Sequence, residues 1–64
     1  MRQFVMHLHD DRMDEPQVFF MSVLDLSRAQ ELAVSRLGQS PHHRRVVLLD
    51  GEEVVASFER ADGL

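Results

Sequence analysis

The order of the secondary-structure elements is decided by residues 17–38, which read QVFFMSVLDLSRAQELAVSRLG. After Gln17 the chain is apolar on both faces of an extended segment as far as Leu24, with only Ser22 as a polar break. A strand of this kind is normally covered on both sides. From Asp25 onward the apolar residues follow helical spacing instead. The stretch therefore predicts a strand that passes directly into a helix.

The predicted helix, 25–38, carries start and stop signals that agree with each other. Asp25 can cap the first turn, while Ser27 with Gln30 offers a competing capping box two residues later. Gly38 suits the position just after the last turn, and a proline soon follows. The apolar stripe of the helix consists of Leu26, Ala29, Ala33 and Leu37. The sequence leaves the start of the helix open by two residues.

Strands are predicted on both sides of this central stretch. Residues 3–9 alternate between an apolar and a more polar face, and an acidic connection, 10–16, follows them. Residues 44–49 and 52–58 form two more strands around Asp50-Gly51, a strong hairpin signal. The fold class is therefore α+β with the order ββαββ, a four-stranded antiparallel sheet with one helix packed on one face. A right-handed crossover gives the spatial order 2-1-3-4.

The chain has 64 residues and so has room for a single domain, in which 59–64 are expected to be a frayed tail. A domain this small buries only about 60% of its unfolded surface. It usually needs a disulfide, a metal or a partner chain for stability. The sequence contains no cysteine, which excludes disulfides and thiolate zinc sites. Two candidates for this stabilising role remain: a metal held by histidines and carboxylates, or another copy of the chain.

Composition narrows the classes of function. The net charge of −4 disfavours a dedicated nucleic-acid binder. The first residues lack the features of a signal peptide, and no apolar run approaches the roughly 18 residues that span a bilayer, so we expect a cytoplasmic protein with no membrane partner. Lysine, asparagine, isoleucine and tyrosine are all absent. This amino-acid composition indicates a G+C-rich bacterial genome.

The apolar residues exceed what one helix can cover. If the helix packs on Phe20, Val46 and Leu48, a second set faces outward and forms the predicted interface: Phe19, Met21, Val23, Val47, Leu49 and Val55. The reversed assignment leaves a similar excess. Because a patch of this size usually marks an interface, we expect a homodimer or another protein partner, joined by sheet face or strand edge. The alternative is a monomer whose 10–16 loop and tail fold over the open face.

Histidines are the main candidates for metal ligands. His7 and His9 are two residues apart on a strand, so they point to the same face, and Asp10 and Asp11 follow directly. His-x-His on a strand is a recurring arrangement of metal ligands. The alternative is that both are ordinary half-exposed residues on a polar strand face.

A basic cluster, His42-His43-Arg44-Arg45, follows the helix. It would bind a phosphate, a nucleic-acid backbone or an acidic partner. Single-stranded nucleic acid also needs an exposed aromatic ring, and Phe19 is the candidate for that role. The alternative is that the cluster pairs with the acidic residues of the 10–16 connection, within one chain or across a dimer.

No catalytic motif is present. None of the serines has a surrounding nucleophile motif, and the three glycines are isolated, so a phosphate-binding loop is missing. We therefore expect that the protein is not an enzyme and that it binds no cofactor.

The chain resembles a loose group of short uncharacterised proteobacterial proteins. The resemblance lies in the strand 4–10 with its Phe and His residues, in the Asp-Leu-led helix start 25–29, and in the closing hairpin 46–55 around Asp-Gly. The group has no established activity. It therefore implies a ββαββ fold and no functional residue.

Overall fold

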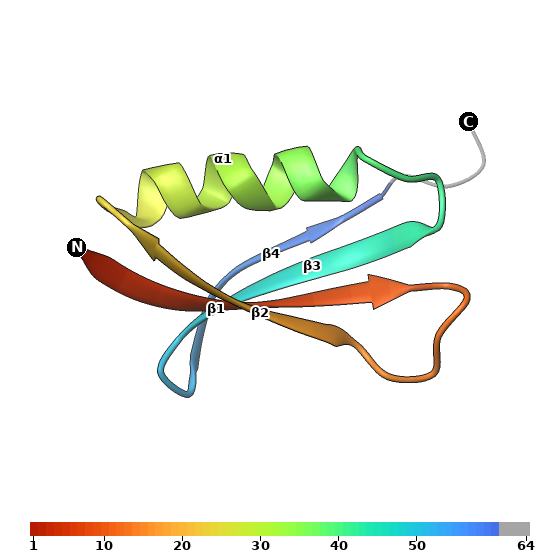
Figure 1. Cartoon of the computed structure of the whole chain (residues 1–64), viewed down its shortest axis with the longest axis horizontal. Coiled ribbons are helices and arrows are strands. Elements are labelled where there is room, and N and C mark those ends of the chain that lie inside the picture. The colour runs from red at the N-terminus through yellow and green to blue at the C-terminus, as the bar shows by residue number, and fades with distance from the viewer. Residues whose placement is uncertain (61–64) are drawn as a thin grey trace.

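The computed structural model describes residues 1–60 as one open sheet of four strands with one helix on it (Figure 1). The elements in chain order are β1 (Arg2–Asp10), β2 (Gln17–Val23), α1 (Leu26–Leu37), β3 (His43–Asp50) and β4 (Glu53–Glu59). The strands lie in the order β2-β1-β3-β4, and every neighbouring pair is antiparallel. The predicted ββαββ fold and its strand order are confirmed. α1 lies along one face of the sheet, and no second helix of residues 1–60 covers the other.

The start of α1 is set by Asp25. Its side chain accepts a hydrogen bond of 2.9 Å from the backbone N–H of Arg28, as an N-cap carboxylate does. The competing box at Ser27 is therefore not used. At the other end the backbone N–H of Gly38 donates to the carbonyl of Val34, and Arg36 lies in the last turn.

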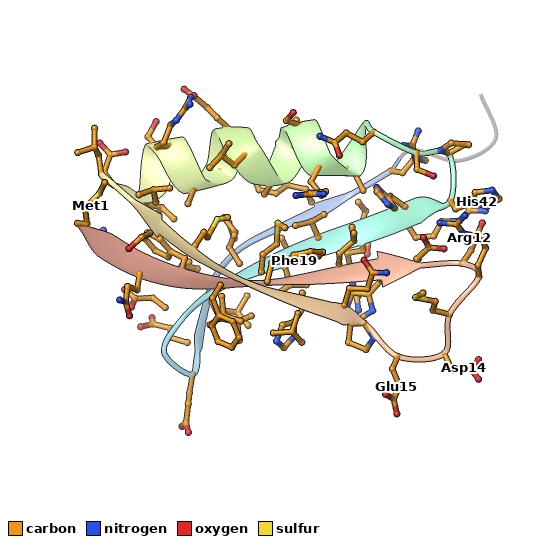
Figure 2. The ribbon with its side chains drawn as sticks, in the orientation of Figure 1. Met1, Arg12, Asp14, Glu15, Phe19 and His42 are labelled. Carbon is orange, nitrogen blue, oxygen red and sulfur yellow. The ribbon has the colours of Figure 1, made fainter. Side chains whose placement is uncertain are left out.

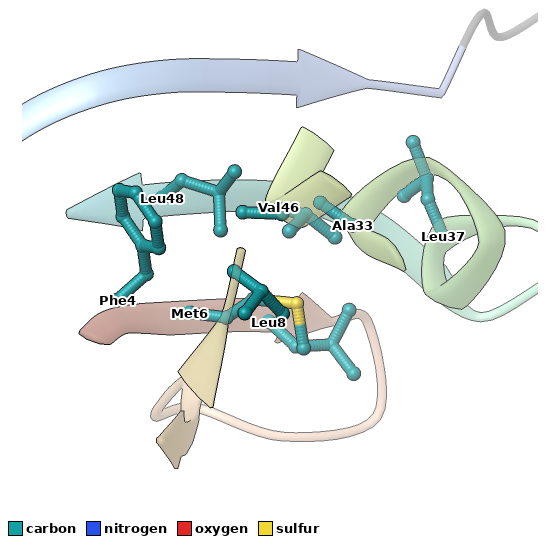
Figure 3. Packing of buried hydrophobic residues seen from close by; sticks show 9 residues of the cluster. Phe4, Met6, Leu8, Ala33, Leu37, Val46 and Leu48 are labelled. Carbon is teal, nitrogen blue, oxygen red and sulfur yellow. The ribbon is translucent and has the colours of Figure 1, made fainter. Parts of the chain in front are cut away.

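The core lies between α1 and the two central strands (Figure 3). β1 contributes alternate residues, of which Phe4 and Leu8 are each 1% exposed. β3 and α1 complete it with Val46, Leu48, Ala29, Ala33 and Leu37. The alanines matter because small side chains let the helix approach the sheet closely. The alternation of β1 thus determines which face of the sheet is the inner one.

The β3–β4 hairpin turns one residue later than its Asp-Gly signal predicts. Asp50 pairs with Glu53, so Gly51 and Glu52 are the central residues of the turn. Gly51 has φ +64°, and Glu52 has a negative φ. Positive φ at the first central position is the pattern of a type II′ turn, in which glycine is preferred there.

Ordered structure extends into the segment predicted to be a frayed tail. Glu59 is the last residue of β4, and the backbone N–H of Arg60 donates to the carbonyl of Arg44. The Arg60 guanidinium also donates to the carbonyls of Leu37, Ser40 and His43, which ties the end of α1 to β3. The rest of the predicted tail, 61–64, lies outside the described residues.

Candidate interaction surface: the open face of the sheet

The register between β1 and β2 decides which side chains face α1. Phe4 of the core lies opposite Met21, and directly opposed residues share a face of the sheet. Alternation then places Phe19 and Val23 on the same side. Val23 is buried, and the Arg36 guanidinium of α1 lies 5.0 Å from the centre of the Phe19 ring. Phe19 is labelled in Figure 2.

The outward orientation expected of Phe19, Met21 and Val23 is therefore wrong. Their strand is apolar on both faces, so its own pattern does not show which face is covered. Val55 also packs against the core, because the register of β4 shifts between Leu48 and Leu49 of β3 and leaves Val55 without an opposed residue. The other two members of the predicted interface, Val47 and Leu49, lie on the open face.

An apolar row crosses the open face from one edge of the sheet to the other. Phe20 of β2 lies opposite Val5 of β1, Val5 opposite Leu49 of β3, and Leu49 opposite Val54 of β4. Phe20 is 82% exposed and Val54 58% exposed, while the two central residues are half-buried. Four apolar side chains are thus aligned across all four strands with no charge among them. We call them the apolar row.

A second row lies beside it and is partly polar. It consists of Val18, His7, Val47 and Ser57, again directly opposed from strand to strand. Val18 is 49% exposed. On the open face, each of the four strands therefore contributes one apolar side chain to the apolar row. The second row adds two valines.

A third row is charged. His9 lies opposite Arg45, and Arg45 lies opposite Glu59, with 3.8 Å between the guanidinium and the carboxylate. Partial burial lowers the pKa of His9 below its ordinary value, and the charges of Arg45 and His7 lower it further. The charged row thus forms the polar end of the open face.

The two histidines of β1 lie on one face, as their spacing predicts, but no third ligand joins them. Within residues 1–60 the structure brings together no group of three His, Asp or Glu side chains that would hold a metal. The guanidinium opposite His9 would also repel a dication. His42 and His43 lie on a different side, beside the loop 11–16.

The basic cluster pairs with acidic residues within the chain, as the alternative reading predicts. His42 lies 3.0 Å and Arg44 3.2 Å from carboxylate oxygens of Asp11. The ring Nδ1 of His43 lies 2.7 Å from the carbonyl of Arg36. Because Arg45 is on the open face, the four residues do not converge on one site.

A shallow groove nevertheless brings three arginines and a histidine together. His9, Arg44, Arg45 and Arg60 line it, together with Glu59. The Arg60 guanidinium is held by three backbone carbonyls. Of the four predicted anion-binding residues, the groove contains Arg44 and Arg45.

Comparison with protein-family models, with curated proteins and with solved structures finds no match to this chain. The assignment of function therefore depends on the geometry of the molecule itself. No helix within residues 1–60 is long and apolar enough to cross a membrane.

Sequence reasoning missed Phe20, the most exposed of the four phenylalanines. It assigned Phe20 to the helix side and Phe19 to the open face. A signal for the correct choice lies in β1, where the apolar face is unambiguous. The β1–β2 register, in which Phe4 lies opposite Met21, carries that signal over to β2.

Proposed function

We propose that this protein is a homodimeric protein-interaction module without catalytic activity. The observation that carries the proposal is the apolar row, which crosses the entire open face and ends in a phenylalanine that is 82% exposed. Exposed apolar patches that are contiguous and rimmed by polar residues are typical of interaction sites. Here the charged row provides the polar rim on one side.

The energetic argument compares the exposed side chains with the stability of the domain. Each large apolar side chain left in water forgoes about 1.5–3 kcal/mol of burial energy. Phe20 and Val18, both on β2, are 82% and 49% exposed. Their combined loss is a substantial fraction of the about 5–15 kcal/mol that stabilises a typical domain. A partner that covers them therefore contributes strongly to stability.

The partner that fits these residues is a second copy of the chain. The apolar row contains no charged side chain, so two copies can bring their rows together without opposing like charges. Twofold symmetry then places the same apolar residues of both chains at one interface. The resembled proteobacterial group, whose activity is not established, adds no competing assignment.

The test is the mass in solution, measured by size-exclusion chromatography with light scattering at tens of micromolar. We expect twice the 7.4 kDa of the chain. Phe20→Ser should weaken the dimer at least tenfold, which corresponds to about 1.4 kcal/mol. Leu32→Ser, at a partly exposed helix position away from the open face, is the matched control and should remain dimeric. A wild-type monomer at this concentration contradicts the proposal.

A second candidate function is anion binding, which the groove lined by His9, Arg44, Arg45 and Arg60 favours. Backbone phosphates are bound by such arginines, and the affinity falls steeply with salt. The test is titration with a short RNA or DNA at two salt concentrations. Unchanged affinity in the Arg44→Ala/Arg45→Ala double variant contradicts this function.

A further inference from the structure

We infer that two copies of the chain join through their β2 edges, antiparallel and with Phe20 opposite its own copy, to form a continuous eight-stranded sheet. This inference rests on the proposed function, because it takes a second copy as the partner. It specifies the surface and the register by which the copies meet.

The two edges of the sheet differ in how they are protected. β4 carries Glu53 and Glu59 at its ends, and the shift in its register with β3 adds an irregularity. Charged ends and bulges are devices that prevent an edge from pairing with another strand. β2 has neither: from Gln17 to Val23 it contains no charge and no proline, and it pairs with β1 without a register shift. The β2 edge is therefore the one open to pairing.

The β2 edge is also accessible. Figure 1 looks onto this edge: β2 passes in front of β1, and no other element crosses over it. Among residues 1–60 no strand pairs with its outward N–H and C=O groups, because β2 is an edge strand. A second strand can thus approach in the plane of the sheet.

The sequence of β2 is compatible with pairing to itself. With Phe20 on the twofold axis, Gln17 lies opposite Val23 of the partner subunit, and all seven residues of the strand pair. On the helix side Phe19 meets Met21 of the partner subunit, and on the open side Phe20 meets Phe20 of the partner subunit. Because the strand has no charge, no like charges are opposed within the seven paired residues. Aromatic pairs across antiparallel strands are favourable.

This register also joins the two apolar rows. The row runs from Val54 to Phe20 in one copy, and the partner's Phe20 begins the same row in the other. The two rows become one stripe across the open face of the joined sheet. A register centred on any other residue of β2 leaves strand ends unpaired.

Packing of one open face on the other is less favourable. It would bury His7, His9 and Arg45 of both copies, since these side chains stand on the open face. Burial of imidazole and guanidinium groups without new partners is costly. Edge pairing leaves all of them at the solvent side. The charges on the open face thus favour the edge over the face.

The chain has no cysteine, which allows a clean cross-linking experiment. Val18→Cys and Ser22→Cys variants are mixed in equal amounts and oxidised, and the disulfides are identified by mass spectrometry. In the inferred register position 18 lies directly opposite position 22 of the partner, at a separation suited to a disulfide. Two copies of position 18 are about 14 Å apart along the strands, too far for a bond. The mixed disulfide, between position 18 and position 22, should therefore make up more than half of all disulfides formed. Random pairing would give one half.

A pair of lysine variants tests the same surface without cross-linking. Val18→Lys/Ser22→Lys opposes lysines across the inferred interface and should weaken the dimer at least tenfold. Val54→Lys, at the far edge of the same apolar row, should leave it unchanged. If Val54→Lys weakens the dimer equally and no mixed disulfide prevails, the inference is wrong while the proposed homodimer stands. A monomeric wild type, in contrast, overturns both.

Discussion

At the scale of single residues, Asp10 shows how a charge is held inside a small domain. Its side chain is 1% exposed at the end of β1. Arg12 donates three hydrogen bonds to it: two from the guanidinium, at 2.7 and 3.0 Å, and one from the backbone N–H, at 2.8 Å. The carboxylate thereby fixes the first residues of the loop 11–16. The buried charge is neutralised by the guanidinium of Arg12, which is two residues away in the chain.

The pair makes stability depend on pH. Hydrogen bonds from the Arg12 side chain, and then from its backbone, hold the pKa of Asp10 well below its ordinary value. The stabilisation is therefore complete above the ordinary aspartate pKa of about 3.9 and is lost as the pH falls toward the folded-state value. We expect Asp10→Asn to lower the melting temperature at pH 7 and the difference from wild type to shrink below about pH 4.

The matched control is Asp14→Asn, at an exposed position in the same loop. It should change neither the melting temperature nor its dependence on pH. A difference between wild type and Asp10→Asn that stays constant from pH 7 to pH 2 would contradict the role given to the carboxylate.

At the scale of elements, one residue sets the start of the helix and one residue allows the turn of the hairpin. Asp25 caps α1, and Gly51 allows the turn between β3 and β4. Both residues act locally, through a hydrogen bond in one case and a positive φ in the other. This is why the sequence indicates these two elements clearly.

The helix cap is tested by a pair of alanine variants. Asp25→Ala removes the acceptor for the Arg28 N–H and should cost about 1 kcal/mol. In a domain of this size that is a fall of about 4–8 °C in melting temperature. Ser27→Ala should have a much smaller effect, because Ser27 lies inside the helix and is not the cap. Equal losses in thermal denaturation would show that both caps are used.

The turn is tested by two glycine variants. Gly51→Ala places a side chain at φ +64°, which costs about 1–2 kcal/mol for an L-residue. Gly38→Ala places one at φ −80° with only ordinary contacts, so it should be neutral or stabilise by up to about 1 kcal/mol. Denaturant unfolding measures both. A Gly51→Ala variant as stable as wild type would rule out the strained turn.

At the scale of the whole molecule, one helix covers one face of a sheet whose other face is also apolar in part. The apolar row exists because residues that are far apart in sequence are brought into one register. No single strand shows it. The same register places histidines and Arg45 on that face, which is why the β2 edge and not the face is assigned to the second copy.

The proposed homodimer predicts that stability depends on concentration. Because dimerisation stabilises the folded chain by mass action, the melting temperature should rise as the protein concentration increases from about 1 to 100 μM. Phe20→Ser should reduce this dependence, because its dimer is weaker. Differential scanning calorimetry at three concentrations makes the measurement. A wild-type melting temperature that is independent of concentration would exclude a homodimer in this range.

The candidate surface was only partly predictable, and β2 shows why. In β1 Phe4, Met6 and Leu8 share one face, and the other face carries Gln3, His7 and His9 besides Val5, so the inner face can be identified. In β2 both faces are apolar, so one shift in register exchanges Phe19 with Phe20 and leaves the pattern unchanged. The pairing of the basic cluster with Asp11 was foreseen as an alternative, since opposite charges lie at two chain segments that meet.

The sequence by itself determined the elements, their order and the strand arrangement, because caps, turns and periodicity act over a few residues and the crossover has one favoured hand. Only the tertiary structure decided which side of β2 is buried, that Val55 turns inward and that four apolar side chains align across the open face. These depend on register between strands. Register is set by packing against the helix, and no local pattern in a two-sided apolar strand encodes it.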